Sequence, residues 1–233
     1  MRSQANSRPG ARASTGATTV DIAIIGTGSV GSGLAAAFVG AGHRVYLTAR
    51  SVDKVEAAAQ AAGATVATSP AAAAALADVV ILAVPFGAVE ELATAIQPVV
   101  NGKTIVDVTN PAKEDWSGPL FGGTDSGAER IAAWLPEAHV VKAFNTLLAN
   151  NIADPAPEGI KLDGYVAADD ADAKAIVLGL AESIGLNPID VGPQSAARQL
   201  ESLAWLNISL NMAPGSTWKT GWKLVGASVS RAA

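Results

Sequence analysis

Hydrophobic residues along the chain form short β-branched runs that alternate with longer alanine-rich stretches from residue 20 onward. The run Val79–Val84 is apolar at every position, which is typical of a strand buried on both faces of a parallel sheet. The alanine-rich stretches have the composition of helices, because alanine has the highest helix propensity. We predict strands at Val20–Ile25, Arg44–Thr48, Thr65–Thr68, Val79–Val84, Lys103–Val108, His139–Ala143, Gly164–Ala168 and Asn187–Val191. We predict helices at Ser29–Gly40, Val52–Ala62, Pro70–Leu76, Val89–Ile96, Ser126–Leu135, Ala171–Ile184 and Ala196–Met212.

This alternation predicts an α/β fold, a doubly wound parallel sheet of the Rossmann type with a smaller C-terminal α/β extension. We expect residues 20–150 to form the nucleotide-binding domain and residues 151–233 to form a segment that caps it and binds the acceptor. Residues 1–19 contain Arg2, Arg8 and Arg12, no acidic residue and no apolar core of a secretory signal. That composition indicates a disordered tail, with a targeting role as the alternative.

Composition excludes several classes of site. The 233 residues include no cysteine, which rules out disulfides, cysteine-ligated zinc, iron–sulfur clusters and a thiolate nucleophile. The two histidines, His43 and His139, leave little room for a histidine site, so we expect no metal. A net charge of −5 argues against nucleic acid and anionic membranes as partners. The longest apolar run, Val79–Val89, is shorter than the about 20 residues of a membrane-spanning helix, so we expect a cytoplasmic protein.

A glycine-rich turn follows the first predicted strand directly and opens the first predicted helix, which is the context that a G-x-G-x-x-G motif needs. Gly26 permits the tight turn, Gly28 lets the backbone approach a pyrophosphate, and Gly31 allows close helix–strand packing. The helix N-terminus then faces the anion. The predicted cofactor-binding turn is Gly26-Thr27-Gly28-Ser29-Val30-Gly31, and an ordinary strand-to-helix turn is the alternative.

The end of the second predicted strand indicates which dinucleotide binds. NAD sites place an acidic residue there, about 20 residues past the glycines, to hold the ribose hydroxyls. This chain has Ala49 and Arg50 at that point, with Lys54 shortly after, and Asp53 lies in the next helical turn, where the helix dipole accounts for it. Arg50 and Lys54 can meet a 2′-phosphate. Taken singly, each is better interpreted as a solvated surface charge, but here both follow a glycine turn and the acidic residue is missing. We therefore predict NADP rather than NAD.

In such sheets the ligand lies outside the carboxyl ends of the strands. The loops expected there are Val84-Pro85-Phe86-Gly87, Thr109-Asn110-Pro111-Ala112 and Phe144-Asn145-Thr146. They offer backbone groups, amides and hydroxyls, but no catalytic histidine, no Ser/His/Asp set and no tyrosine followed by lysine. We interpret Asp107, inside a buried strand, as a structural hydrogen-bond acceptor that needs a partner, with a catalytic carboxylate as the alternative. The other candidates, Tyr46, Tyr165, His43 and His139, lie in strands or in a turn without a motif around them.

The expected site therefore has no catalytic side chain. A dehydrogenase of alcohols or hydroxy acids must move a proton with the hydride and so positions an acid or base. Hydride exchange between two redox cofactors needs mainly proximity and orientation, because the cofactors carry the chemistry. The sequence thus indicates a reductase that passes hydride from a nicotinamide to a flavin or deazaflavin.

The chain resembles the coenzyme F420-dependent NADP oxidoreductases over about residues 20–226. The stretches that carry the resemblance are Ile22–Gly31, Arg50 with Lys54, Ile81–Phe86, Val108–Pro111, Ser126–Glu129, Val140–Thr146, Asp190–Pro193 and Ala197–Leu203. The resemblance implies NADP and coenzyme F420 as cofactors, with FMN or FAD as the alternative acceptor. It also implies that Thr27, Arg50 and Lys54 contact the 2′-phosphate.

The resemblance further implies that Val84, Pro85 and Asn110, with Pro111 beside them, lie near the nicotinamide. The family often has serine just before the arginine, whereas this chain has Ala49, so one hydroxyl contact to the phosphate is lost. Other acceptors (a free flavin, a quinone, or ferric iron through flavin) and a non-catalytic NADP-binding regulator are the alternative functions. A homodimer is expected because an alanine-rich core buries modest area per residue.

The aromatic residues late in the chain remain open at this stage. Trp205, Trp218 and Trp222, with Met212, match no fixed feature of the family. They are interpreted as packing of the last helix or as a dimer contact. A stacking wall for a tricyclic ring is the alternative.

Overall fold

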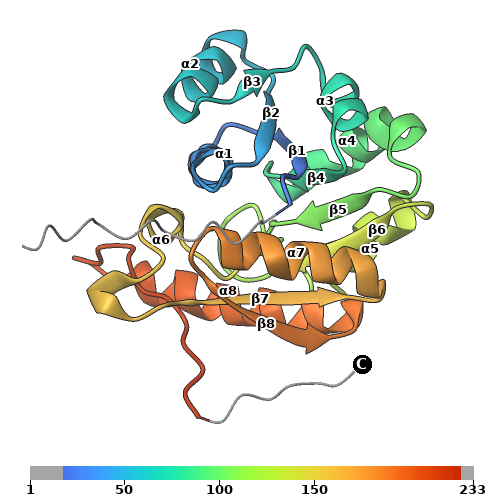
Figure 1. Cartoon of the computed structure of the whole chain (residues 1–233). Helices are drawn as coiled ribbons and strands as arrows, with labels where there is room; N and C mark the ends of the chain where they lie inside the picture. The colour runs from blue at the N-terminus through green and yellow to red at the C-terminus, as the bar shows by residue number, and fades with distance from the viewer. Residues whose placement is uncertain (1–17, 227–233) are drawn as a thin grey trace, which may run out of the picture.

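The computed structural model describes residues 18–226, in which eight strands form one sheet between two layers of helices (Figure 1). The strand order is β3-β2-β1-β4-β5-β6-β7-β8. The strands are β1 Asp21–Ile25, β2 Arg44–Thr48, β3 Thr65–Val66, β4 Val79–Leu82, β5 Thr104–Asp107, β6 His139–Ala143, β7 Asp163–Ala168 and β8 Asn187–Gly192. The predicted Rossmann-type α/β fold is therefore confirmed.

The helices are α1 Ser29–Gly40, α2 Val52–Ala62, α3 Pro70–Leu76, α4 Val89–Ile96, α5 Gly127–Trp134, α6 Ala149–Ala153, α7 Ala171–Ser183 and α8 Ala197–Asn211. Short 3₁₀ turns lie at Phe86–Ala88, Gln97–Val99, Pro157–Gly159 and Gln194–Ala196. The sequence prediction did not include α6 or these turns, which are too short to show a helical period. None of the helices within residues 18–226 is long and apolar enough to cross a membrane.

Alternate residues of β1 explain why both faces of the sheet are covered. Ile22 and Ile24 pack with α1 and α7 on one face, whereas Ala23 and Ile25 pack with α3, α4 and α5 on the other. A strand that is apolar on both faces must be covered on both. The strands β1 to β6 are parallel, and the order reverses between β1 and β4, which is where this fold binds its ligands.

The direction of β7 differs from the all-parallel expectation. It pairs antiparallel with β6, with Val141 opposite Ala168 and Ala143 opposite Val166. The connection from β6 contains only α6 and a 3₁₀ turn, so no helix carries the chain back across a face of the sheet. As a result β7 and β8 continue the same sheet, and both begin at the edge where β1 to β6 end.

The chain after α8 returns to the start of β7. Asp163 of β7 accepts hydrogen bonds from the Lys223 ammonium (2.7 Å) and from the backbone N–H of Leu224. The Asn187 amide donates to the same carboxylate over 2.7 Å. Of the tail predicted at 1–19, only Thr18 and Thr19 fall inside the described residues. The domain boundary near residue 150 stays a prediction.

Candidate active site

The glycine turn adopts a backbone that side chains would block at two of its positions. Gly26 has φ +121°, and a Cβ there would lie 2.1 Å from the carbonyl oxygen of Ala83. A Cβ on Gly31 would lie 2.1 Å from the carbonyl oxygen of Gly26. Around Gly28, in contrast, no atom lies within 4 Å of the Cβ position. The structure thus gives the three glycines the turn, open-approach and close-packing geometries that the motif predicts.

Helix α1 begins at this turn with no side chain capping it. Gly28 is the N-cap residue, and the first turn contains no acidic residue. The N–H groups of the first turn and the positive end of the helix dipole therefore face the open space beside Gly28. Thr27 is half-buried and Ser29 is exposed at the same end, with Val30 half-buried behind them. This arrangement can bind a phosphate or pyrophosphate.

Arg50 and Lys54 lie at the neighbouring strand end. Arg50 follows β2 and Lys54 lies in the first turn of α2, and both side chains are exposed. The Thr48 carbonyl at the end of β2 accepts a hydrogen bond from the Gly26 N–H over 2.8 Å, which joins this strand end to the glycine turn. Within residues 18–226 neither Arg50 nor Lys54 forms an ion pair. Both cations can therefore meet an anion from solvent.

The loop after β4 lies against the glycine turn from the other side. The Ala83 N–H donates to the carbonyl oxygen of Ile25 over 2.9 Å, which extends the strand pairing. The Val84 Cγ1 lies 3.2 Å from the Cβ position of Gly26, and Pro85 next to it is exposed. Val84 and Pro85 thus lie at the same edge as the turn.

The loop after β5 meets the start of α5. A Cβ on Gly127 would lie 2.9 Å from the Cγ of Pro111 and 3.1 Å from the Cε2 of Phe86. Ser126 caps α5 by accepting a hydrogen bond from the Glu129 N–H over 3.2 Å, as the expected capping box requires. The reciprocal half of the box is absent, because the Ser126 N–H donates to Asp125 Oδ1 and the Glu129 carboxylate accepts from the Ser126 hydroxyl. The loops of β4 and β5 therefore close on one another around Gly127.

Two amides connect this loop to the end of β6. The Asn110 side chain donates to the backbone carbonyl of Asn145 over 2.7 Å, and the Asn145 side chain donates to the Asn110 Oδ1 over 2.9 Å. Asn145 also donates to the carbonyl oxygen of Leu200 in α8 over 3.1 Å. Asn110 is thereby fixed between β6 and α8.

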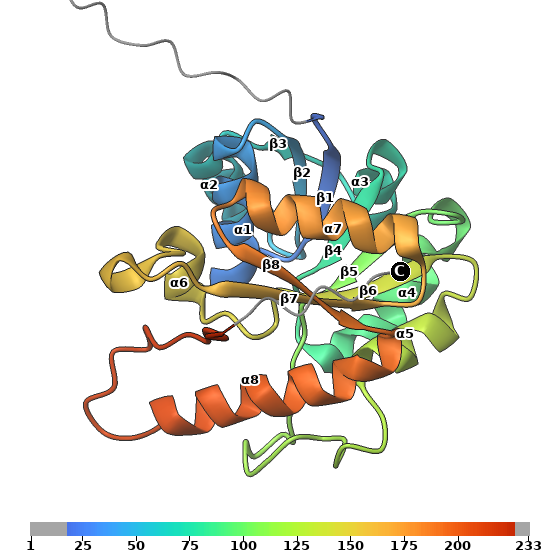
Figure 2. The ribbon, with the colours of Figure 1, turned by 60° about the horizontal axis from the view of Figure 1, so that its bottom comes forward.

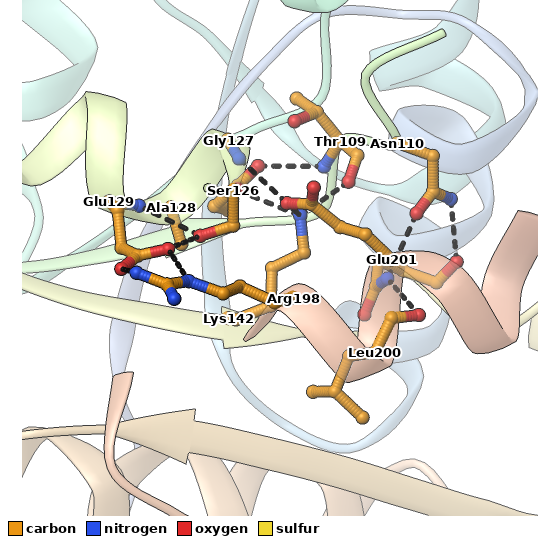
Figure 3. Close-up of polar contacts among 12 residues, drawn as sticks. Thr109, Asn110, Ser126, Gly127, Ala128, Glu129, Lys142, Arg198, Leu200 and Glu201 are labelled. Carbon is orange, nitrogen blue, oxygen red and sulfur yellow. Dashed lines mark hydrogen bonds and ion pairs between the residues drawn. The ribbon is translucent and has the colours of Figure 1, made fainter. Parts of the chain in front are cut away.

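A fully buried lysine lies beneath these loops (Figure 3). The Lys142 ammonium donates to Asp107 Oδ2 (2.9 Å), to the Thr109 carbonyl oxygen (2.5 Å) and to Glu201 Oε1 (2.8 Å). The interpretation of Asp107 as a structural acceptor is confirmed, since it also accepts from the Thr109 N–H over 2.8 Å. Glu201 Oε1 accepts in addition from the Gly127 N–H over 2.8 Å.

The cluster of Asp107, Lys142 and Glu201 places two carboxylates around one ammonium. Burial raises the pKa of Glu201, and the negative charge of Asp107 adds to this, while Lys142 opposes it. Removing Lys142 would leave both buried carboxylates without a compensating charge. The sequence-based prediction missed Lys142 and Glu201 as site residues. The signal in the sequence was a lysine inside an apolar strand. The structure places this lysine directly opposite Asp107 in the sheet register.

The remaining candidates have structural roles or lie apart. The Val20 N–H donates to His43 Nδ1 over 3.2 Å, and His43 Nε2 pairs with Ser183 Oγ, while burial lowers the pKa of the ring. His139 begins β6 at the opposite edge of the sheet from the site. Burial raises the pKa of Tyr165 to about 12, with the Asp163 carboxylate adding to the effect.

An aromatic pair lies between α8 and the loop after Pro111. The rings of Trp116 and Trp205 stack with centroids 6.4 Å apart and an interplanar angle of 24°. Trp116 has φ +57° and is exposed. Figure 2 shows α8 passing beside β8 toward α6, with this loop beneath it. Trp218 and Met212 are exposed, and Trp222 is half-buried near the start of β7.

The chain matches the family model of NADP oxidoreductases that are coenzyme F420-dependent over residues 21–111. The F420-dependent NADP reductase of Methanothermobacter thermautotrophicus is 36% identical over 208 residues, which cover 82% of this chain and 89% of that protein. The chain belongs to the F420-dependent NADP oxidoreductase family. The resemblance stated from the sequence and the predicted class of enzyme, an NADP-dependent oxidoreductase, are thus confirmed.

Two further comparisons differ in how much of the chain they cover. A crystal structure from Arthrobacter sp. fb24, provisionally assigned as an F420 dependent NADP-reductase, is 31% identical with a TM-score of 0.76, covering 84% of this chain and 96% of that one. Metalloreductase STEAP3 of Rattus norvegicus is 31% identical over only 102 residues, 44% of this chain and 20% of that protein.

The residues of this oxidoreductase fit a dinucleotide at the site. The space at Gly28 faces an uncapped helix N-terminus, as a pyrophosphate requires. Among the described residues, Asn145 Oδ1 and Thr109 Oγ1 are buried polar side-chain atoms with no hydrogen-bond partner. Both lie in the loops at the carboxyl edge, so a carboxamide group bound there would find two buried polar atoms free to hydrogen-bond with it. A separate hollow of about 770 Å³ between α8, β8 and residues 222–224 shares no lining residue with the predicted cofactor set.

Proposed function

We propose that this protein transfers a hydride between NADP(H) and coenzyme F420, through proximity of the two cofactors and without a side-chain acid or base. The observation that carries the proposal is the burial of the ionisable cluster beneath the nicotinamide side of the site. Asp107 and Lys142 are fully buried and Glu201 nearly so, and each is occupied by hydrogen bonds. A group that cannot reach the substrate cannot exchange a proton with it.

The residues of this chain then act by binding and orientation. The N-terminus of α1 and Gly28 hold the pyrophosphate, and Thr27, Arg50 and Lys54 bind the 2′-phosphate. Val84, Pro85, Asn110 and Pro111 lie beside the nicotinamide ring. NADPH supplies the hydride from its nicotinamide and the deazaflavin ring accepts it, so the reducing chemistry belongs to the two cofactors. The remaining proton comes from solvent.

The direct test mixes the purified protein with NADPH and oxidised F420 and follows the absorbance of both cofactors. Equal loss of NADPH and oxidised F420 supports the proposal. Unchanged absorbance in both directions, with NADP⁺ and reduced F420 as the reverse test, refutes it.

Reduction of another acceptor is the second candidate, because 102 residues of the chain are similar to part of a metalloreductase. The same assay with FMN, FAD, a quinone and ferric iron plus flavin distinguishes the two. The proposal for F420 requires that kcat/KM for F420 exceed the value for every other acceptor. NADPH binding without reduction of any acceptor would instead indicate a regulatory protein.

We also propose that the protein forms a homodimer through the exposed side of α8. Leu206, Leu210 and Met212 are large apolar side chains exposed near the end of that helix. Light scattering on the full chain tests this. A dimer that becomes a monomer in the Leu206→Lys/Leu210→Lys variant supports the proposal, and a wild-type monomer refutes it.

A further inference from the structure

Lys142 connects three segments that are far apart in the sequence. Its ammonium reaches β5 at Asp107, the following loop at the Thr109 carbonyl, and α8 at Glu201. All three of its N–H donors are therefore occupied. Figure 3 shows the ammonium in the middle of these groups, between the loop of Thr109 and Asn110 and helix α8.

Helix α8 holds the same loop a second time, one residue earlier. The carbonyl oxygen of Leu200 accepts from the Asn145 side chain, which donates to Asn110 Oδ1 as well. Leu200 and Glu201 thus fix the loop from two directions, one through Asn145 and Asn110 and the other through Lys142 and Thr109. Any shift of this turn of α8 must break one of these connections.

Stability alone does not account for such a cluster. Burying two carboxylates and an ammonium removes them from water, and apolar replacements of similar volume are often neutral or stabilising. A second connection between α8 and α5 already exists at the surface, where Arg198 donates to both oxygens of Glu129 (2.9 and 2.6 Å). The buried cluster adds a directional connection to the loop that carries Asn110.

We propose that Glu201, acting through Lys142, is a positioning residue that sets the nicotinamide loop Thr109–Pro111 relative to α8. The inference rests on the proposed function only in placing the nicotinamide at this loop. In this proposal Glu201 and Lys142 touch neither cofactor; they hold Thr109, and with it the adjoining Asn110 and Pro111, which face the nicotinamide. The cluster therefore acts on the nicotinamide half of NADPH and not on the adenosine half, which binds at the glycine turn and Arg50.

The test compares NADPH with 2′,5′-ADP, which contains the 2′-phosphate end but no nicotinamide. The Glu201→Met variant keeps the volume of the side chain and removes both hydrogen bonds. We expect it to weaken NADPH binding about tenfold or more, a change of about 1.4 kcal/mol, and to leave 2′,5′-ADP binding within about twofold. The Glu201→Gln variant keeps Oε1 as the acceptor for Lys142 and Gly127, so it restores NADPH binding to within about twofold of wild type.

The matched control is Arg198→Gln, which breaks the surface connection between α8 and α5 but leaves Lys142 untouched. It should leave the dissociation constants of both ligands unchanged. Equal weakening of NADPH and 2′,5′-ADP by Glu201→Met would mean a general structural role and would overturn the inference. So would wild-type affinities in that variant, or a Glu201→Gln variant as weak as Glu201→Met.

A second measurement uses the wild-type chain and does not depend on a variant that folds. Amide hydrogen exchange of Thr109 and Gly127, whose N–H groups bind Asp107 and Glu201, should slow on adding NADPH and not on adding 2′,5′-ADP. The same response to both ligands contradicts the inference. Neither measurement needs F420, so a failure of F420 reduction leaves this result readable on its own.

Discussion

Asn110 and Asn145 form a reciprocal amide pair, in which the Asn110 side chain donates to the Asn145 backbone over 2.7 Å and the Asn145 side chain donates back over 2.9 Å. The two residues follow neighbouring parallel strands, β5 and β6, so the sheet register brings their loops together. The pair closes the candidate site on the side away from the glycine turn. It also leaves Asn145 Oδ1 buried without a partner among the described residues.

Replacing Asn145 by alanine leaves Asn110 Oδ1 and the Leu200 carbonyl without their donor. We expect kcat/KM for NADPH to fall about tenfold, or about 1.4 kcal/mol, because Asn110 loses its fixed position. Steady-state kinetics measures the loss, and thermal unfolding checks that the variant is folded. Asn150→Ala, which removes an exposed amide from α6, is the control and should retain wild-type kinetics.

Two substitutions in the glycine turn should affect different quantities, one the stability of the fold and the other the binding of NADPH. In Gly31→Ala the new Cβ meets the Gly26 carbonyl at 2.1 Å, so we expect a loss of about 2 kcal/mol or more in the free energy of unfolding. In Gly28→Ala the Cβ meets no atom within 4 Å, so stability should hold while NADPH binding weakens. Denaturant unfolding and titration calorimetry report the two quantities. Gly28→Ala with wild-type NADPH affinity would argue against a pyrophosphate at this position.

The two exposed cations after β2 predict which nucleotide is preferred. Arg50→Glu places a negative charge where the 2′-phosphate is expected, and NADH has no such group. We expect NADPH affinity to fall by about tenfold to a hundredfold, with NADH affinity nearly unchanged. Lys161→Glu, an exposed change outside the predicted site, controls for net charge. Equal losses for both nucleotides would show that Arg50 does not contact the 2′-phosphate.

Asp163 predicts how acid affects the C-terminal segment. Burial raises the pKa of its carboxyl, but hydrogen bonds from Leu224, Lys223 and Asn187 outweigh this and hold the pKa below its ordinary value. A carboxylate with a lowered folded-state pKa stabilises the fold above the unfolded pKa of about 3.9, and this contribution disappears as the pH falls through the lower folded value.

We therefore expect Asp163→Asn to lower the free energy of unfolding by about 1–3 kcal/mol at pH 7. The difference from wild type should begin to shrink near about pH 4, where the carboxyl of the unfolded chain takes up a proton, and should disappear only as the pH falls through the lower folded pKa. Unfolding curves recorded from pH 7 to pH 3 test the prediction, with the exposed Asp154→Asn as the control. A pH-independent difference would show that the charge of Asp163 is not what holds residues 223–224.

The parts of the site that the sequence predicted are local ones. Gly26, Gly28 and Gly31 lie within one turn, and their neighbours along the chain determine what each must do. The strand ends that deliver Val84 and Asn110 follow from apolar runs that can be read directly. The bond between Lys142 and Glu201 joins positions 59 residues apart, and no periodic pattern records which helix reaches which strand.

The direction of β7 could not be predicted from the sequence either. A strand–helix–strand unit has the same sequence pattern whether its strands run parallel or antiparallel to the strands before it. Only the missing crossover helix between Ala143 and Asp163 distinguishes the two, and α6 with its five residues is too short to show as a periodic pattern. The need of Asp107 for a partner was evident, but Lys142 becomes that partner only through the register of β5 with β6.

Reversal of β7 has a consequence for how enzymes with this fold can diverge. Strands β7 and β8 both start at the ligand-binding edge, and α8 follows β8 in the chain. Leu200 and Glu201 in the first turns of α8 bind the loops at that edge. The last turns of α8, from Leu206 to Asn211, lie near α6. Asn207 and Asn211 of α8 and Asn151 of α6 all donate to Thr220. If this end of α8 lies on the acceptor side, as the acceptor-binding role expected for residues 151–233 implies, substitutions there would change the acceptor side and leave the glycine turn and Arg50 in place. We therefore expect variants at Leu206–Asn211 to change the preference for the acceptor and not the preference for NADPH over NADH.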